Sequence, residues 1–197
     1  MKPYNPGERG FTLIELLVVI GIVAILSVVV ILTLNPAELL KQARDSNRIS
    51  DLATIRSGLS LYLSDVSSPN LASSSNGNKY GNVFITGIAT SALPTTPGWG
   101  VTAVFTSSTA STSLAVDSTG WIPVSFNGIS SGAPLGVLPD DPVNNGNFFY
   151  EYVATSTGPA FKVAVHQMES QKYISVAAND GGLSASAYEV GTNLLGL

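Results

Sequence analysis

A single carboxylate, Glu15, lies inside the most apolar stretch of this sequence. The stretch runs from Phe11 to Leu34, and Glu15 is its only charged residue. A lone ionised carboxylate is costly in hydrocarbon, so such a residue is usually neutralised, paired or functional. The position of Glu15 therefore predicts a function for this side chain, and its partner is the first question that the sequence raises.

Four carboxylates in the C-terminal half could supply the oxygen ligands that a hard cation such as calcium requires. Calcium takes roughly 6–8 oxygen ligands from carboxylates and carbonyls. Aspartate before proline or glycine also forms turns, and no spaced ligand series of the EF-hand kind is present. We carry calcium as a hypothesis, expect no other cofactor, and name as its candidate ligands Asp140, Asp141, Asp180 and Glu189.

The other residues of types that act in catalysis show no pattern typical of an enzyme. The only histidine, His166, is expected on the exposed face of a strand with Lys162 and Ala164, and the chain has no cysteine for a thiolate site. Nothing resembles a nucleophile elbow or a pair of catalytic carboxylates, and Gly181-Gly182 lacks the lysine of a phosphate-binding loop. A net charge of −4 argues against specific nucleic-acid binding.

The apolar stretch is long enough to span a membrane. Leu16 to Leu34 gives 19 residues without a charge, and a bilayer needs about 20. A secretory signal peptide has a shorter apolar core of ~7–15 residues followed by a small-residue cleavage site, whereas here Leu34 is followed by Asn35-Pro36-Ala37. A plain signal-anchor helix explains the length, but it explains neither Glu15 nor the polar leader Met1 to Gly10.

The string Gly10-Phe11-Thr12-Leu13-Ile14-Glu15-Leu16 resembles the processing site of type IV pilins and type II secretion pseudopilins. That family has a leader ending in glycine, then phenylalanine, then glutamate at the fifth position of the mature chain. Lys2 and Arg9 match its basic leader, and Glu8 departs from it. The close match covers about the first quarter of the chain.

The resemblance implies a processing and assembly route. A prepilin peptidase would cut between Gly10 and Phe11, and the new amine of Phe11 is usually N-methylated in this family. The apolar helix would first anchor the chain as a single pass in the inner (cytoplasmic) membrane. It would later form the core of a helical homo-oligomeric filament, extracellular or periplasmic, built with an assembly ATPase and platform machinery.

Glu15 fits that route as an assembly residue. After cleavage the free ammonium of Phe11 would titrate near ~8 when unperturbed, and in a helix residues four apart fall on one face. The partner of Glu15 is then the amine of Phe11, either its own or that of a neighbouring subunit. Either pair costs less than two separate buried charges, and an incoming subunit would stop where its amine meets Glu15.

Beyond the membrane segment the sequence predicts a second helical region. Asn35-Pro36 predicts a kink at Pro36 because proline removes a helical hydrogen bond. An apolar stripe at helical spacing follows and is expected to pack under a sheet, while the charged residues from Lys41 to Arg56 are expected to form a solvated face. The stripe consists of Ile49, Leu52, Ile55, Leu59 and Leu63.

The expected fold class is α+β, with a long N-terminal helix whose second half packs against a small antiparallel sheet, as in pilins. The expected divisions are a leader (1–10), a membrane and filament-core helix (11–36), an amphipathic helix (37–66) and a head of loop and sheet (67–197). Alternating apolar residues place the best hairpin at Phe148 to His166, with an aromatic stripe facing the helix. The strands are expected at Val83–Thr86, Val101–Thr106, Trp121–Phe126, Phe148–Ala154, Ala160–His166 and Tyr173–Ala177.

The function expected is a structural subunit of a type IV pilus or pilus-like filament. A type II secretion major pseudopilin or a DNA-uptake pilin stays open within the family. From another class, a membrane-anchored extracellular binding domain that never polymerises also stays open. It would display the polar Leu71 to Gly136 region as its recognition surface.

Overall fold

The computed structural model describes residues 10–71, 79–82, 108–154 and 160–194. The chain forms two compact units, an N-terminal unit (Met1–Leu40) and a head (Lys41–Leu197), and each is described by itself. Most of the leader, the strands expected at 83–86 and 101–106 and the hairpin turn at 155–159 lie outside the described residues.

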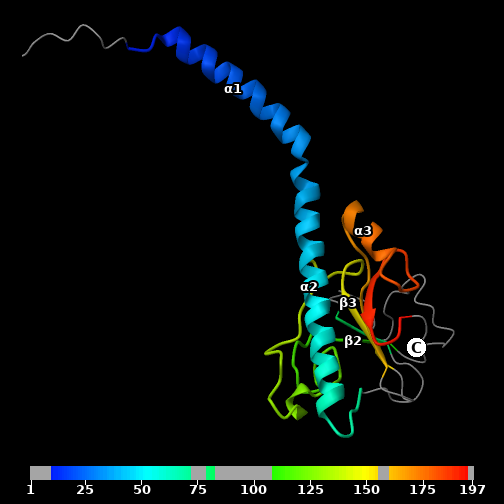
Figure 1. Cartoon of the computed structure of the whole chain (residues 1–197). Coiled ribbons are helices and arrows are strands. Elements are labelled where there is room, and N and C mark those ends of the chain that lie inside the picture. The colour runs from blue at the N-terminus through cyan, green and yellow to red at the C-terminus, as the bar shows by residue number, and fades with distance from the viewer. Residues whose placement is uncertain (1–9, 72–78, 83–107, 155–159, 195–197) are drawn as a thin grey trace, which may run out of the picture. The chain divides into compact units, whose positions relative to one another are not determined.

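The N-terminal unit consists of α1 (Leu13–Leu34) and the first turn of α2 (Pro36–Asp65) (Figure 1). Asn35 separates them in a left-handed conformation with φ 41°, and its carbonyl accepts hydrogen bonds from the backbone N–H groups of Glu38 and Leu39. Pro36 is the first residue of α2, where its missing N–H would have had no helical partner. The interruption lies at the dipeptide where a kink was expected.

Within the head, the apolar stripe of α2 is buried as the spacing predicts. Leu52, Ile55 and Leu59 have no exposed surface, and Ile49 and Leu63 are partly buried against the same core. The packing of this face explains the helix better than its intrinsic propensity does, since tertiary burial supplies most helical stability in proteins.

The sheet of the head has the strand order β2-β1-β3-β4-β5. All neighbours are antiparallel except β1 and β2, which are parallel. Tyr152 of β3 lies opposite Val163 of β4. The strands are β1 (Lys79–Asn82), β2 (Ser108–Ala110), β3 (Tyr150–Ala154), β4 (Phe161–Val165) and β5 (Tyr188–Gly191).

The aromatic stripe of the hairpin belongs to the core under α2. Tyr150 and Tyr152 are fully buried in the same cluster as Leu52 and Leu59, which confirms the α+β arrangement of a helix on an antiparallel hairpin. The hydroxyl of Tyr152 donates to the carbonyl of Leu71 at 3.1 Å. The hydroxyl of Tyr150 also has a partner, Asp51, so both buried tyrosines keep a hydrogen bond at their polar end.

Two strand predictions were wrong. Residues 173–177 belong to α3 (Gln171–Ala177), because the Ser170 side chain accepts the N–H of Tyr173 and caps a helix there. Residues 121–126 are buried but irregular. Their backbone bonds go to a preceding loop, as in Trp121 N–H to the carbonyl of Ser113, and a 3-10 turn follows at Phe126–Gly128. Strand β5 was not anticipated, because Tyr188-Glu189-Val190-Gly191 is short.

Candidate functional site

The segment around the expected processing point is exposed. Gly10 and Phe11 precede the helix, and Phe11 is 91% exposed. Helix α1 begins at Leu13 with Thr12 as its N-cap. Phe11 therefore lies outside the helix in the uncleaved chain, and the pairing expected after cleavage between Glu15 and a Phe11 amine stays a prediction.

Glu15 has a partner within its own segment. The backbone N–H and the hydroxyl of Thr12 donate to Glu15 Oε2 at 2.8 and 2.7 Å, while the N–H of Glu15 donates to Thr12 Oγ1 at 3.3 Å. This reciprocal arrangement is a capping box. The Thr12-Leu13-Ile14-Glu15 spacing is the sequence signature of this capping box.

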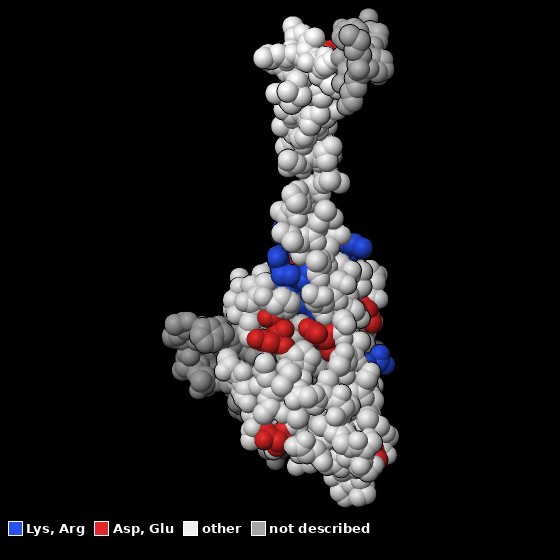
Figure 2. Space-filling model, turned by 90° about the vertical axis from the view of Figure 1, so that its left-hand side faces the viewer, with Lys and Arg blue, Asp and Glu red and all other residues white. Residues whose placement is uncertain are grey.

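The surface of α1 is apolar on every side. None of its residues is buried, and its large apolar side chains are exposed from 51% at Val18 to 82% at Leu13. In the view of Figure 2 the surface over α1 is almost entirely free of charged side chains, which gather over the rest of the chain. A helix that is apolar all round needs a membrane or a packed protein environment. Between Leu13 and Asp65, the 18-residue window of highest mean hydropathy reaches 3.2.

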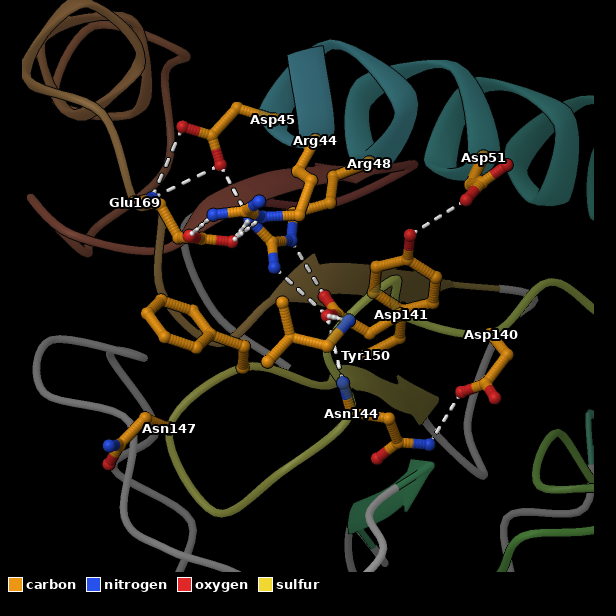
Figure 3. A network of polar contacts seen from close by, with 12 residues as sticks. Arg44, Asp45, Arg48, Asp51, Asp140, Asp141, Asn144, Asn147, Tyr150 and Glu169 are labelled. Carbon is orange, nitrogen blue, oxygen red and sulfur yellow. Dashed lines mark hydrogen bonds and ion pairs between the residues drawn. The ribbon is translucent and has the colours of Figure 1, made fainter. Parts of the chain in front are cut away.

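The head contains a buried cation, Arg48, where the sequence predicted a solvated charged face. Arg48 and Asp45 on α2 have no exposed surface, so that prediction was wrong for these two residues. The Arg48 guanidinium donates from Nε and Nη2 to the two oxygens of Asp141 at 2.7 and 2.9 Å, and from Nη1 to Asp45 Oδ1 at 2.7 Å. Figure 3 shows these groups converging from α2 and from the loop after Pro139.

A second arginine extends this network to the segment before α3. Glu169 Oε1 accepts Arg48 Nη1 at 2.7 Å and Arg44 Nε at 2.9 Å. Asp45 also accepts the backbone N–H groups of Glu169 and Ser170, the latter at 2.8 Å. The buried ion network, defined as Arg44, Asp45, Arg48, Asp141 and Glu169, therefore joins α2 to two separate loops.

The protonation of this network follows from its contacts. The hydrogen bond from Arg44 lowers the pKa of Glu169. Burial alone would lower the pKa of Arg48, but hydrogen bonds to Asp141 and then to Asp45 raise it above its ordinary value. Nearby, Tyr150 Oη donates to Asp51 Oδ2 at 2.7 Å, and burial raises the pKa of Asp51.

Of the four carboxylates considered for calcium, Asp141 belongs to this network, and Asp140 precedes it in the chain. Asp141 is 4% exposed, and its Oδ1 also accepts the N–H groups of Val143 and Asn144 at 2.8 and 3.2 Å. Asp140 accepts from the amide of Asn144 at 2.5 Å. The Asp-Asp-Pro segment thus forms a turn, and one of its carboxylates is the counter-ion of Arg48.

The other two carboxylates, Asp180 and Glu189, meet each other after α3. Asp180 Oδ2 accepts the N–H of Glu189 at 2.6 Å, and Glu189 Oε1 accepts Lys162 Nζ at 2.9 Å. Among the described residues no group of three or more histidine, cysteine, aspartate or glutamate side chains is placed to hold a metal ion. Calcium binding therefore stays an untested hypothesis, with these carboxylates already bonded to protein donors.

The strand face assigned to His166 is not exposed. Lys162 is 1% and Ala164 0% exposed, which corrects the expectation of an exposed face. The His166 side chain is 11% exposed, its Nδ1 lies 3.1 Å from Glu151 Oε1, and its ring stacks on Phe149 with centroids 4.4 Å apart. The alternation of Phe161, Val163 and Val165 predicted that the other residues of this strand share the opposite face, but not that this face is buried.

Comparison with protein families finds one match, to the prokaryotic N-terminal methylation motif over residues 5–31. The matched residues include Gly10, Phe11, Thr12 and Glu15, and they carry the prepilin motif of type IV pilins and pseudopilins. Comparison with curated proteins and with solved structures gave no match. The motif implies processing by a prepilin peptidase, and α1 fits a single-pass membrane anchor.

Proposed function

We propose that this chain, which carries the prepilin motif, is a structural subunit of a type IV pilus or a pilus-like filament. The observation that carries the proposal is the motif at residues 5–31, which overlaps a helix, α1, with no buried residue. A prepilin peptidase would cut after Gly10, and the subunit would polymerise through α1. The motif family is structural, and we propose no catalytic activity for the chain.

The exposed surface of α1 supports two successive environments. Helix α1 has 22 residues, of which Glu15 is the only charged one, and about 20 apolar residues span a bilayer. Leaving the bilayer for water would expose all of those side chains again, at about 25 cal/mol for each Å² of apolar surface. Transfer into a bundle of α1 helices from other subunits keeps that surface covered, which is why extraction and polymerisation are expected to be one coupled event.

The capping box supports a change of partner for Glu15 during assembly. Both hydrogen bonds that the described residues donate to its side chain end on Oε2, so Oε1 can accept a further donor. Cleavage after Gly10 would place an ammonium on Phe11, the residue that precedes Thr12. We propose that this amine, from the same or a neighbouring subunit, pairs with Glu15, while Thr12 supplies the interim partner that membrane insertion requires.

The test is electron microscopy of material sheared from the cells that make the protein, with mass spectrometry of its N-terminus. Filaments composed of a chain that begins at an N-methylated Phe11 are the expected result. A processed chain found only in periplasmic filaments of a secretion system would favour the pseudopilin alternative, and loss of DNA uptake on deletion would favour the uptake pilin. An intact Met1 in membranes without filaments would overturn the proposal in favour of an anchored binding domain.

A further inference from the structure

A second buried ion pair lies on the face of the sheet that α2 does not cover. Lys162 of β4 and Glu189 of β5 are each 1% exposed, and Lys162 Nζ lies 2.9 Å from Glu189 Oε1. Val163 and Val190 pair across the same strands and belong to the core under α2. Since side chains alternate along a strand, Lys162 and Glu189 both point to the opposite face, where an amine and a carboxyl group meet.

The carboxyl group of Glu189 is held by backbone donors on its other oxygen. The N–H groups of Leu183 and Ser184 donate to Oε2 at 2.8 and 3.1 Å. The turn brings its backbone this close because position 182 is a glycine, where a Cβ would lie 1.8 Å from Oε2. Two fixed N–H donors on one oxygen are the arrangement that stabilises negative charge on a tetrahedral intermediate of acyl transfer.

A third group, Asp180, lies beside the pair. Its Oδ1 accepts the N–H of Gly182 at 2.7 Å and its Oδ2 accepts the N–H of Glu189 at 2.6 Å. A Cβ on Gly182 would meet both Glu189 Oε2 and, at 3.0 Å, Asp180 Oδ1, so both carboxyl groups face the same α-carbon. Burial raises the pKa of Asp180, which makes its carboxylate a better proton acceptor than that of an ordinary aspartate.

We propose that Lys162 and Glu189 condense in the folded chain to an isopeptide bond that links β4 to β5. The Lys162 ammonium first passes a proton to the Glu189 carboxylate, which leaves a neutral amine and a carboxylic acid. Nζ then attacks Cδ and forms the C–N bond, and the charge that develops on Oε2 is held by Leu183 and Ser184. Asp180 takes a proton from Nζ and gives one to Oε1, the C–Oε1 bond breaks, and one water leaves with no oxidation or reduction.

The pair is buried and joins the edge strand β5 to β4, which gives a reason for the link to form and a role for it. Burial disfavours both charges of the pair, and a fixed intramolecular encounter can reach effective molarities of about 10⁵–10⁸ M. The chain has no cysteine, so no disulfide can tie down the edge strand β5, whose ladder to β4 spans four residue pairs. An amide between these strands would hold β5 when the head is pulled. This inference does not depend on filament assembly.

The test is the intact mass of the full chain, purified in detergent after folding and measured under denaturing conditions, with a proteolytic digest. The expected result is a loss of about 18 Da and a peptide pair joined at Lys162 and Glu189. The matched control is Lys162→Arg, which keeps the positive charge without a nucleophilic amine and is expected at full mass. A wild-type chain at full mass would overturn the proposal and leave an ordinary ion pair.

One other reaction would remove the same mass. Asp180-Gly181 can lose water to a succinimide, which mild base reopens and which needs no lysine. A loss that persists in Lys162→Arg and disappears in mild base would therefore overturn the proposal. The digest of the wild-type chain decides the point even if a variant fails to fold. Asp180→Asn is expected to accumulate the unlinked chain, and linkage as fast as in the wild type would overturn the role given to Asp180.

Discussion

The N-terminal helix and the head distribute polar and apolar residues in opposite ways. Helix α1 leaves all its apolar side chains exposed and buries nothing, whereas the head buries charged side chains such as Arg48, Asp45 and Lys162. Each of these three buried charges is matched by a partner within the head. Among the described residues of its own unit nothing buries the apolar surface of α1, so that surface needs a membrane or a packed protein environment.

The two regions obtain their stability from different surroundings. The head gains its free energy of folding from contacts inside one chain, and its buried ion network orients two loops on α2. Helix α1 has no buried residue, so changes to it are expected to alter insertion or assembly and to leave the folding of the head untouched.

The largest expected effect is on Glu15. Glu15→Leu should permit membrane insertion and abolish filaments, because an incoming Phe11 amine would be buried without a counter-ion. Filaments in sheared fractions and the amount of chain in membranes are the two measurements. Thr12→Val is the matched variant: it removes the hydroxyl of the capping box but keeps the carboxylate and the backbone N–H of residue 12 that donates to it, so insertion and filaments should both be retained. Normal filaments from Glu15→Ala would contradict the proposed role.

The next effect concerns the buried cation of the head. Arg48→Met should lower the free energy of unfolding by about 3–5 kcal/mol, because Asp45 and Asp141 would stay buried without their counter-ion. Denaturant unfolding of the full chain in detergent, followed by tryptophan fluorescence, measures it. Arg56→Met removes an exposed arginine from the same helix and should change the value by less than about 0.5 kcal/mol. Equal effects of the two variants would show that the Arg48 network is dispensable.

Matched apolar truncations compare the two regions directly. Leu59→Ala in the head should cost about 2–5 kcal/mol of unfolding free energy, because a fully buried side chain is lost. Leu26→Ala in α1 removes a side chain that is 59% exposed and should leave the unfolding of the head unchanged. The same denaturant experiment measures both. A destabilised head in Leu26→Ala would mean that α1 contributes to folding of the head after all.

The smallest effect is a dependence on pH. Hydrogen bonding from Arg44 lowers the pKa of Glu169 from its ordinary value of 4.5, so Glu169 contributes stability that is present above that value and is lost as the pH falls through the lowered pKa. Glu169→Gln should therefore be less stable than the wild type at pH 7 and lose less stability on acidification to pH ~3. The effect of Asp51 on stability has the opposite sign, because burial raises its pKa and its ionised form is therefore disfavoured in the folded chain. The stability of Asp51→Asn relative to the wild type should therefore be higher at neutral pH than at low pH. Parallel stability–pH curves for wild type and Glu169→Gln would contradict the assignment.

Local patterns predicted the elements whose signals are local. The stripe Leu52, Ile55 and Leu59 repeats at helical spacing, and the alternation of Tyr150 with Tyr152 marks a strand, so both were placed correctly. The Tyr173–Ala177 prediction failed because a cap from Ser170 outweighed a short apolar alternation. Strand β5 exists through its pairing with β4, which is a long-range contact that no local pattern contains.

For the N-terminal segment, residue types and spacing were sufficient to predict a function. Gly10, Phe11, Thr12 and Glu15 form a contiguous motif, and nineteen uncharged residues from Leu16 to Leu34 require an apolar environment whatever the fold. Only the tertiary structure decided the fate of the charged residues in the head. Whether Arg48 is solvated or buried depends on Asp141, 93 positions away, and whether Lys162 meets Glu189 depends on strand register. The energy of a charge is set by what surrounds it, and folding brings those surroundings from distant parts of the chain.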